Sequence, residues 1–159
     1  MFGGARIVVA LIVLPSVAAA EVDDGIAAYH GENYAQLARA IAPKAAAGNA
    51  AAQLTLAMLY ETGRGIARDD AQAARWYAEA AAHGMAEARL RLGIMYAEGR
   101  GVNTDKARAH MWLGLAVQAL PESALREDAL AALTNLARRM SAAEIAEGER
   151  LARGVTPKP

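Results

Sequence analysis

The side chains best suited to acid–base or metal chemistry are few in this chain and widely spaced. No two histidines stand four residues apart and no His-Glu-x-x-His is present, so the pattern of a zinc enzyme is missing; the histidines are His30, His83 and His110. Acidic pairs occur at Asp23-Asp24 and Asp69-Asp70, but adjacent carboxylates do not face one another on a helix and are better explained as solvated caps. No nucleophile is paired with a base. The sequence therefore predicts a protein that is not an enzyme, with no catalytic residue, metal site or cofactor.

Glycines that flank an arginine form the second pattern that could indicate a ligand site, because glycine-rich loops can bind phosphate. Gly63-Arg64-Gly65 and Gly99-Arg100-Gly101 repeat the same three residues. Neither leads into the Gly-Lys-Ser/Thr of a phosphate-binding loop, and no strand pattern precedes either one. A glycine just after a helix adopts the left-handed conformation at no steric cost. Gly63 and Gly99 are therefore predicted to end helices, and nucleotide binding is not expected.

These glycines belong to a repeat of 36 residues. Residues 48–83 align with residues 84–119 without a gap, and after alanines are set aside nine identical positions remain, which are Gly48, Leu54, Leu56, Tyr60, Gly63, Arg64, Gly65, Asp69 and Trp76. A period of this length is typical of a solenoid, in which each unit buries its apolar face against its neighbours. The sequence therefore predicts an all-α solenoid.

Each unit is predicted to contain a helix, a Gly-x-Gly turn, a second helix and a short link. Asp69 and Asp105 precede alanine-rich stretches, where a carboxylate can cap free N–H groups at the start of the second helix. Trp76 and its counterpart 36 residues on are expected to pack between helix pairs. Small residues at one shared position, Ala57 and Gly93, predict a place where a partner helix approaches closely.

The repeat divides the chain into six predicted segments. They are a signal peptide (1–20), a degenerate repeat (21–48), two full repeats (49–84 and 85–120), C-terminal capping helices (121–154) and a disordered tail (155–159).

Within the flanking segments, helix signals predict four further helices. In the degenerate repeat, a short helix over Gly25–His30 precedes one over Tyr34–Ala47, which Pro43 is expected to kink or cut late. Pro121 is expected to be the first residue of a helix that continues over Glu122–Arg139. Ser141 and Glu144 fit a capping box, which predicts a last helix that ends near Arg153.

The first twenty residues have the layout of a secretory signal peptide. Arg6 is their only charge, an apolar run follows at Ile7–Leu14, and Ala18-Ala19-Ala20 precedes Glu21. Cleavage after Ala20 is expected to leave a chain without a stable membrane span in the periplasm, with secretion as the alternative. The chain has no cysteine, which excludes a lipid-modified cysteine and disulfides. Its formal net charge of zero argues against a nucleic-acid partner.

The spacing Tyr60-x-x-Gly63-x-Gly65…Asp69…Trp76…Gly84, with its copy 36 residues on, resembles the Sel1-like repeat (SLR) family. Residues 138–153 also resemble the closing helix of bacterial members. The resemblance implies a right-handed αα superhelix of the tetratricopeptide type with C-terminal capping helices. It implies a monomeric adaptor, assembly factor or signalling regulator that binds a protein or peptide.

Cysteine-rich relatives have been linked to β-lactam binding or hydrolysis, which leaves an enzyme or small-ligand binder on the same scaffold as the alternative. This chain departs from them because it has no cysteine. None of its serines offers the Ser-x-x-Lys of serine β-lactamases; they are Ser16, Ser123 and Ser141.

The partner is expected to bind along the first helices of the two units, which line the concave surface in solenoids of this kind. Positions at which the units differ are free to set specificity, and they include the pairs Gln53/Arg89 and Thr55/Arg91. The predicted groove is an apolar stripe edged by charges, formed by Leu54, Met58, Leu90 and Ile94 with Glu61, Glu87 and Arg91. The alternative is that the stripe is core. Leu90→Glu and Ile94→Glu are predicted to abolish partner binding and leave helical content unchanged, whereas unfolding would place both residues in the core.

Overall fold

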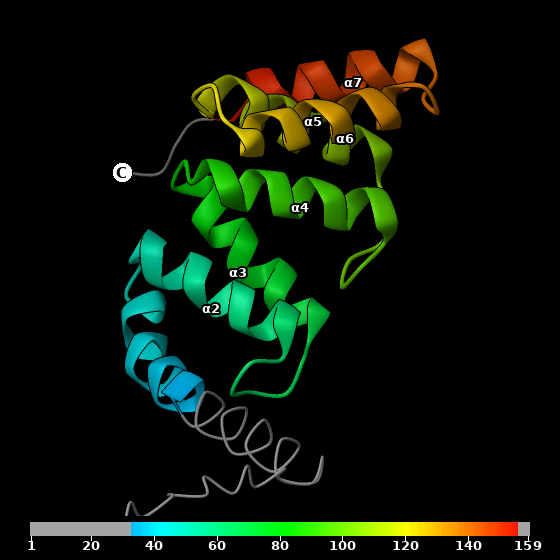
Figure 1. Ribbon diagram of the computed structural model, residues 1–159. Helices are drawn as coiled ribbons and strands as arrows, with labels where there is room; N and C mark the ends of the chain where they lie inside the picture. Colours follow the sequence, from blue (N-terminus) through cyan, green and yellow to red (C-terminus); the bar gives the residue numbers. More distant parts are fainter. Residues whose placement is uncertain (1–32, 156–159) are drawn as a thin grey trace, which may run out of the picture.

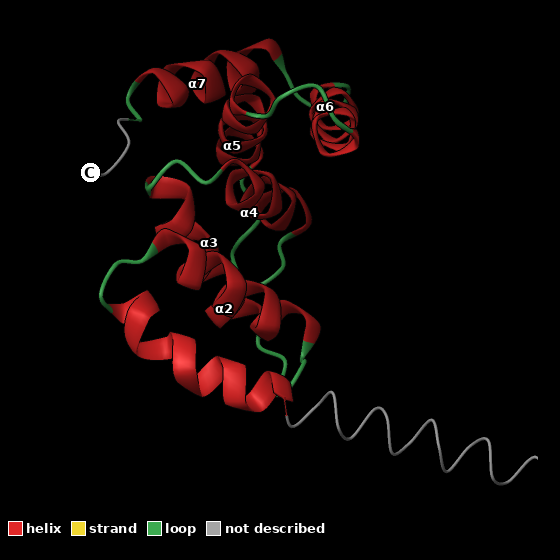
Figure 2. Ribbon diagram, turned by 60° about the vertical axis from the view of Figure 1, so that its left-hand side comes forward, coloured by secondary structure: helices red, strands yellow, loops and turns green. Residues whose placement is uncertain are grey.

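The computed structural model describes residues 33–155, and all regular elements in that range are α-helices. A helical segment over residues 33–46 is followed by six helices, which are α2 (Ala50–Thr62), α3 (Asp70–Ala82), α4 (Ala86–Glu98), α5 (Lys106–Ala119), α6 (Ala124–Ala137) and α7 (Ala142–Arg153). They stack in chain order, with segment 33–46 at one end and α6 and α7 at the other (Figures 1 and 2). The predicted all-α solenoid is therefore confirmed.

Three sequence predictions fall on the chain's ends. The signal peptide (1–20), the short helix over Gly25–His30 and all but the first residue of the C-terminal tail lie outside the described residues. Among the described residues, no helix has both the length and the apolar character needed to cross a bilayer.

The helix boundaries are set by the caps that the sequence predicts. Asp69 Oδ1 accepts a hydrogen bond from the Gln72 amide at 3.0 Å, and Asp105 makes the same bond at the start of α5. Gly63 and Gly99 follow α2 and α4 with φ of 70° and 71°, in the left-handed region that glycine adopts without strain. The capping box at Ser141 is also present.

Adjacent units are joined by a close contact at the second glycine of each turn. A Cβ at Gly101 would fall on the backbone of Asp70 at the start of α3. One unit earlier, a Cβ at Gly65 would fall on Tyr34, at the start of segment 33–46. Segment 33–46 therefore occupies the position of a second helix in a unit that precedes the first full repeat.

The core follows the stack as three successive clusters. Segment 33–46 and α2 enclose the first cluster, α2, α3 and α4 the second, and α4, α5 and α6 the third. Trp76 packs against both the first and the second cluster, as expected of a residue between helix pairs. A Cβ at Gly93 would lie 2.8 Å from Leu113 Cγ, which confirms the predicted close approach of α4 and α5. Each unit thus buries its apolar face against its neighbours.

One of the two predictions that rested on proline is wrong in detail. Pro121 does not open α6; the N-cap is Ser123, whose hydroxyl accepts a hydrogen bond from the Arg126 amide at 3.3 Å. Leu120, as the residue before a proline, is extended with ψ of 134°, and the chain needs further residues to turn into the helix. Segment 33–46 agrees with the helix predicted over Tyr34–Ala47, and it continues past Pro43 to residue 46. A proline so near a helix end disturbs only one preceding turn.

Candidate functional site

The residues of the predicted groove lie on α2 and α4, but the structure places them in different environments. Leu90 is 3% exposed and belongs to the third core cluster, and Ile94 is partly buried against that cluster. That cluster is completed by residues of α5 and of α6, and α6 lies outside the repeat, so the period alone does not predict the full burial of Leu90 and Ile94. The prediction that Leu90 belongs to an exposed stripe is therefore wrong, and Leu90→Glu is expected to unfold the chain.

The remaining apolar residues of the stripe are on α2. Leu54 is partly buried against the second core cluster, whereas Met58 is 37% exposed. Glu61, Glu87 and Arg91 are all intermediate in exposure. The accessible part of the predicted groove is therefore a smaller surface, the α2–α4 face, formed by Leu54, Met58, Glu61, Glu87 and Arg91.

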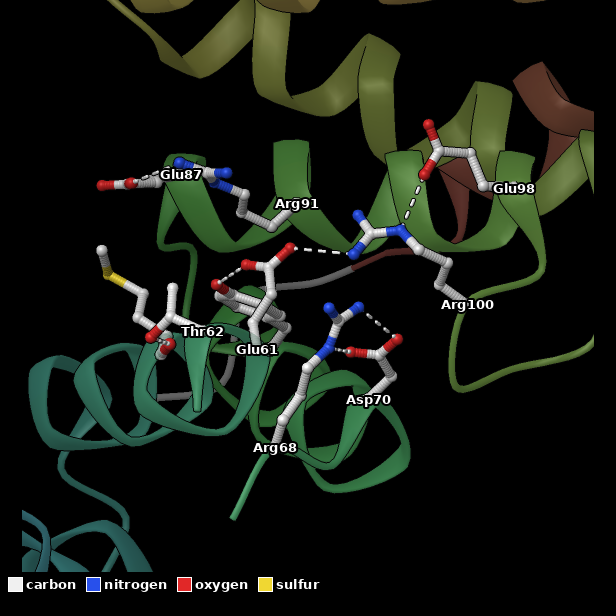
Figure 3. A network of polar contacts seen from close by, with 10 residues as sticks. Glu61, Thr62, Arg68, Asp70, Glu87, Arg91, Glu98 and Arg100 are labelled. Carbon is white, nitrogen blue, oxygen red and sulfur yellow. Dashed lines mark hydrogen bonds and ion pairs between the residues drawn. The ribbon is translucent and has the colours of Figure 1, made fainter. Parts of the chain in front are cut away.

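Glu61 is held in place by two hydrogen bonds. Its Oε2 accepts from the Tyr77 hydroxyl of α3 at 2.6 Å, and its Oε1 accepts from Arg100 Nη1 at 3.2 Å. Arg100 lies in the turn after α4 and also donates from Nε to Glu98 at 2.7 Å. Figure 3 shows Glu61 and Arg100 pointing toward one another across the gap between α2 and α4. The Glu61 side chain is 14% exposed, so the carboxylate is fixed at the edge of the α2–α4 face.

Tyr77 is kept as a neutral donor by its surroundings. Burial raises the pKa of the Tyr77 phenol, and the hydrogen bond to the Glu61 carboxylate raises that pKa further. At neutral pH the Tyr77 hydroxyl therefore serves as a fixed hydrogen-bond donor to Glu61.

Arg91 is less completely satisfied. Its Nη2 lies 3.8 Å from Glu87 Oε1, which is longer than a hydrogen bond, and its Nε is buried without a hydrogen-bond partner among the described residues. Arg68 makes a contrast nearby, because its Nε and Nη2 donate to the two carboxylate oxygens of Asp70 at 3.1 and 3.0 Å (Figure 3). That hydrogen bonding by Arg68 holds the pKa of Asp70 below its usual value. Arg91 is thus a cation on the α2–α4 face with donor capacity to spare.

Sequence reasoning missed Tyr77 and Arg100 as partners of Glu61. Arg100 stands 39 residues from Glu61 in the chain, and its counterpart Arg64 lies over the Tyr34 ring instead. The available signal was the identity of Arg64 and Arg100, but that identity does not reveal that Arg100 bonds to Glu61.

Gln53 and Arg89, which were expected at the specificity-setting surface, are buried instead. Gln53 Nε2 donates to the Ala45 carbonyl at 3.1 Å, and Arg89 Nε donates to the Ala81 carbonyl at 3.3 Å. Both bonds tie the first helix of a unit to the second helix of the unit before it.

The histidines do not assemble a site among the described residues. His83 is the C-cap of α3, and His110 lies on α5 beside Gly148 of α7. His30 lies outside the described residues. Within residues 33–155, no group of three or more His, Cys, Asp or Glu side chains is placed to hold a metal ion.

Comparison with known proteins relates this geometry to a family. A sequence model of the Sel1 repeat matches residues 50–85 and 86–119. No curated protein matches the sequence. The crystal structure of c5321, a protective antigen of uropathogenic Escherichia coli with an SLR fold, superposes with a TM-score of 0.70 and 26% identity. The superposition covers 77% of this chain and 25% of c5321, so the chain spans a quarter of that protein.

A second solved structure shares the fold alone. The Sel1 repeat protein from Oxalobacter formigenes superposes with a TM-score of 0.54 and 18% identity, over 88% of this chain and 65% of that one. Sel1 repeats form helical scaffolds for protein interaction, and both units here have the helix pairs, turns and caps of such a scaffold. The chain is a Sel1-like repeat protein.

Proposed function

We propose that this protein is an exported interaction module that binds a segment of a partner protein on its α2–α4 face. The observation that carries the proposal is Arg91, a partly exposed arginine whose ion pair with Glu87 is longer than a hydrogen bond. An arginine with unused donors is suited to bind a carboxylate of the partner in a fork geometry.

The neighbours of Arg91 favour a partner with one apolar anchor and one acidic residue. Met58 is an exposed, flexible apolar side chain, of the kind that adapts to a partner's surface. Glu61 is held by Tyr77 and Arg100, so it needs no rearrangement when a partner binds. An amphipathic helix or an extended peptide can present an apolar and an acidic side chain on one side.

Export is proposed from the sequence of residues 1–20, whose charge, apolar run and alanines match a signal peptide. Cell fractionation with N-terminal sequencing of the mature protein tests it. A periplasmic chain that begins at Glu21 would support export, and a cytoplasmic chain that retains residues 1–20 would contradict it.

Site-specific crosslinking tests the binding face. A photoreactive residue placed at Met58 is expected to crosslink a partner in cells, and Arg91→Glu is expected to abolish that product because it replaces attraction with repulsion. Leu130 on α6 is the matched control position, since it is also an exposed apolar side chain, with 47% exposure. Equal crosslinking from Met58 and Leu130, or a product that persists in Arg91→Glu, would count against the proposal.

A further inference from the structure

A cavity of about 460 Å³ lies where segment 33–46 ends against α2 and α3, and it shares no residue with the α2–α4 face. Its wall is formed by Ala45, Ala46, Ala47, Gly48, Gln53, Arg75, Trp76, Glu79 and His83. Gln53 is 3% exposed, and its Nε2 donates to the Ala45 carbonyl, whereas its Oε1 is buried and has no hydrogen-bond partner within residues 33–155. Buried acceptors are nearly always paired in proteins. The Oε1 atom therefore marks a position that suits a hydrogen-bond donor.

The equivalent junction one repeat later, where α3 ends against α4 and α5, shows what fills such a space. Arg89 takes the place of Gln53 there, and its Nη2 lies 3.8 Å from the Cβ position of Gly84. At Gly48, the counterpart of Gly84, no heavy atom of the described residues beyond the chain neighbours lies within 4 Å of that position. The longer side chain of Arg89 thus extends a guanidinium over the glycine, whereas the shorter Gln53 leaves that volume to the cavity.

The wall of the cavity also differs in charge between the two junctions. Arg75, Glu79 and His83 line it, and the residues 36 positions on are Met111, Leu115 and Ala119. The C-terminal end of segment 33–46 contributes the partial negative charge of a helix end. The Trp76 ring already accepts one cation, since the Arg75 guanidinium carbon lies 5.4 Å from its centroid.

We propose that this cavity binds the guanidinium group of an arginine side chain supplied by a partner protein. The cation would occupy the volume that Arg89 fills in the next junction, and a small shift of the Gln53 side chain would let the cation donate to Oε1, which is buried in the free chain. The C-terminal end of segment 33–46 supplies the opposing partial negative charge, and Trp76 supplies aromatic surface in the wall. The cavity is a second contact point on the scaffold and does not depend on the α2–α4 face.

Nuclear magnetic resonance titration of the mature chain with N-acetyl-arginine methylamide tests this assignment. The Trp76 indole N–H and the Gly48 amide are expected to shift saturably, with a dissociation constant on the order of 1 mM for one side chain. The signal of the Trp112 indole N–H is expected not to shift. The lysine analogue is expected to bind more weakly, because an ammonium lacks the planar fork of a guanidinium.

Variants of Gln53 distinguish an arginine-binding site from a cavity that binds no ligand. Gln53→Arg is expected to fill the space as Arg89 does, and so to weaken binding of the arginine probe by about tenfold or more. The control is Gln118→Arg, which adds the same charge at an exposed position of α5 and is expected to leave binding unchanged. Gln53→Met keeps the volume and removes the acceptor, so it is expected to weaken binding by about five- to tenfold even if the arginine variant does not fold. The proposal fails if the Trp76 indole shows no saturable shift or if Gln53→Met binds as tightly as the native chain. It also fails if N-acetyl-glutamate methylamide shifts the Trp76 indole more strongly, because Arg75 and His83 would then have made an anion site.

Discussion

The contact between the turn of one unit and the preceding helix can be tested by adding a single methyl group. Gly101 has φ of 68°, and a Cβ there would fall on the Asp70 carbonyl and lie 2.7 Å from the Ala71 amide nitrogen. Gly84 has φ of 88°, but a Cβ there would meet only Arg89 Nη2, at 3.8 Å. Gly101→Ala and Gly84→Ala therefore carry the same type of backbone strain, and only the first also carries a backbone clash.

The magnitude follows from separating these two terms. An alanine in the left-handed region costs about 1–2 kcal/mol relative to glycine, which is the whole cost expected for Gly84→Ala. At Gly101 the added methyl group meets backbone rather than a mobile side chain, so α3 and the turn must move apart, at a further cost of about 1–3 kcal/mol. The total of about 2–5 kcal/mol is a large share of the roughly 5–15 kcal/mol that stabilises a typical domain.

Urea unfolding followed by circular dichroism at 222 nm measures the difference. Gly101→Ala is expected to unfold at a clearly lower urea concentration than Gly84→Ala, with both below the native chain. The pair Gly65→Ala and Gly48→Ala repeats the comparison one unit earlier. A Cβ at Gly65 would fall on Tyr34, whereas one at Gly48 would meet no atom within 4 Å among residues 33–155 beyond its chain neighbours. Equal midpoints within each pair would refute the claim that the second glycine joins adjacent units.

Three further predictions test the core, a cap and a buried phenol. Leu90→Ala is expected to lose about 2–5 kcal/mol of unfolding free energy in urea because it leaves a cavity between α4 and α6, whereas Met58→Ala is expected to lose less than about 1 kcal/mol. Asp69→Ala is expected to cost about 1 kcal/mol in thermal unfolding because α3 loses its N-cap, and Asp69→Asn is expected to restore most of it. The raised pKa of Tyr77 means that the unfolded chain releases this proton first, so its stabilising effect is present below about pH 10 and is lost as pH rises above that value. Melting temperatures are therefore expected to fall less steeply above pH 10 in Tyr77→Phe than in the native chain, and identical slopes would contradict the assignment.

The parts of the fold that could be predicted from sequence are those that depend on neighbouring residues. An aspartate cap at Asp69 bonds an amide three residues on, and a left-handed glycine at Gly63 closes the helix that directly precedes it. These interactions involve only residues that are close in the sequence. The repeat supports each prediction a second time, because the same residue types recur at Asp105 and Gly99.

The parts that could not be predicted depend on what lies across a helix interface. Leu54 and Leu90 are equivalent in the repeat, but only Leu90 belongs to the cluster that α6 closes. The segment from Pro121 onward does not follow the period, so no counterpart indicates where α6 packs. Glu61 likewise has no carboxylate counterpart, since Ala97 occupies that position.

Buried positions that differ between repeats are more informative about ligands than exposed ones. A surface position can vary without consequence, whereas a buried position such as Gln53 or Arg89 must satisfy the same surroundings in each unit. Both side chains donate to an equivalent carbonyl, so that interaction is preserved. What differs is the volume beyond it, which Arg89 fills and Gln53 does not. The shorter side chain therefore leaves room at the first junction for the guanidinium group proposed above.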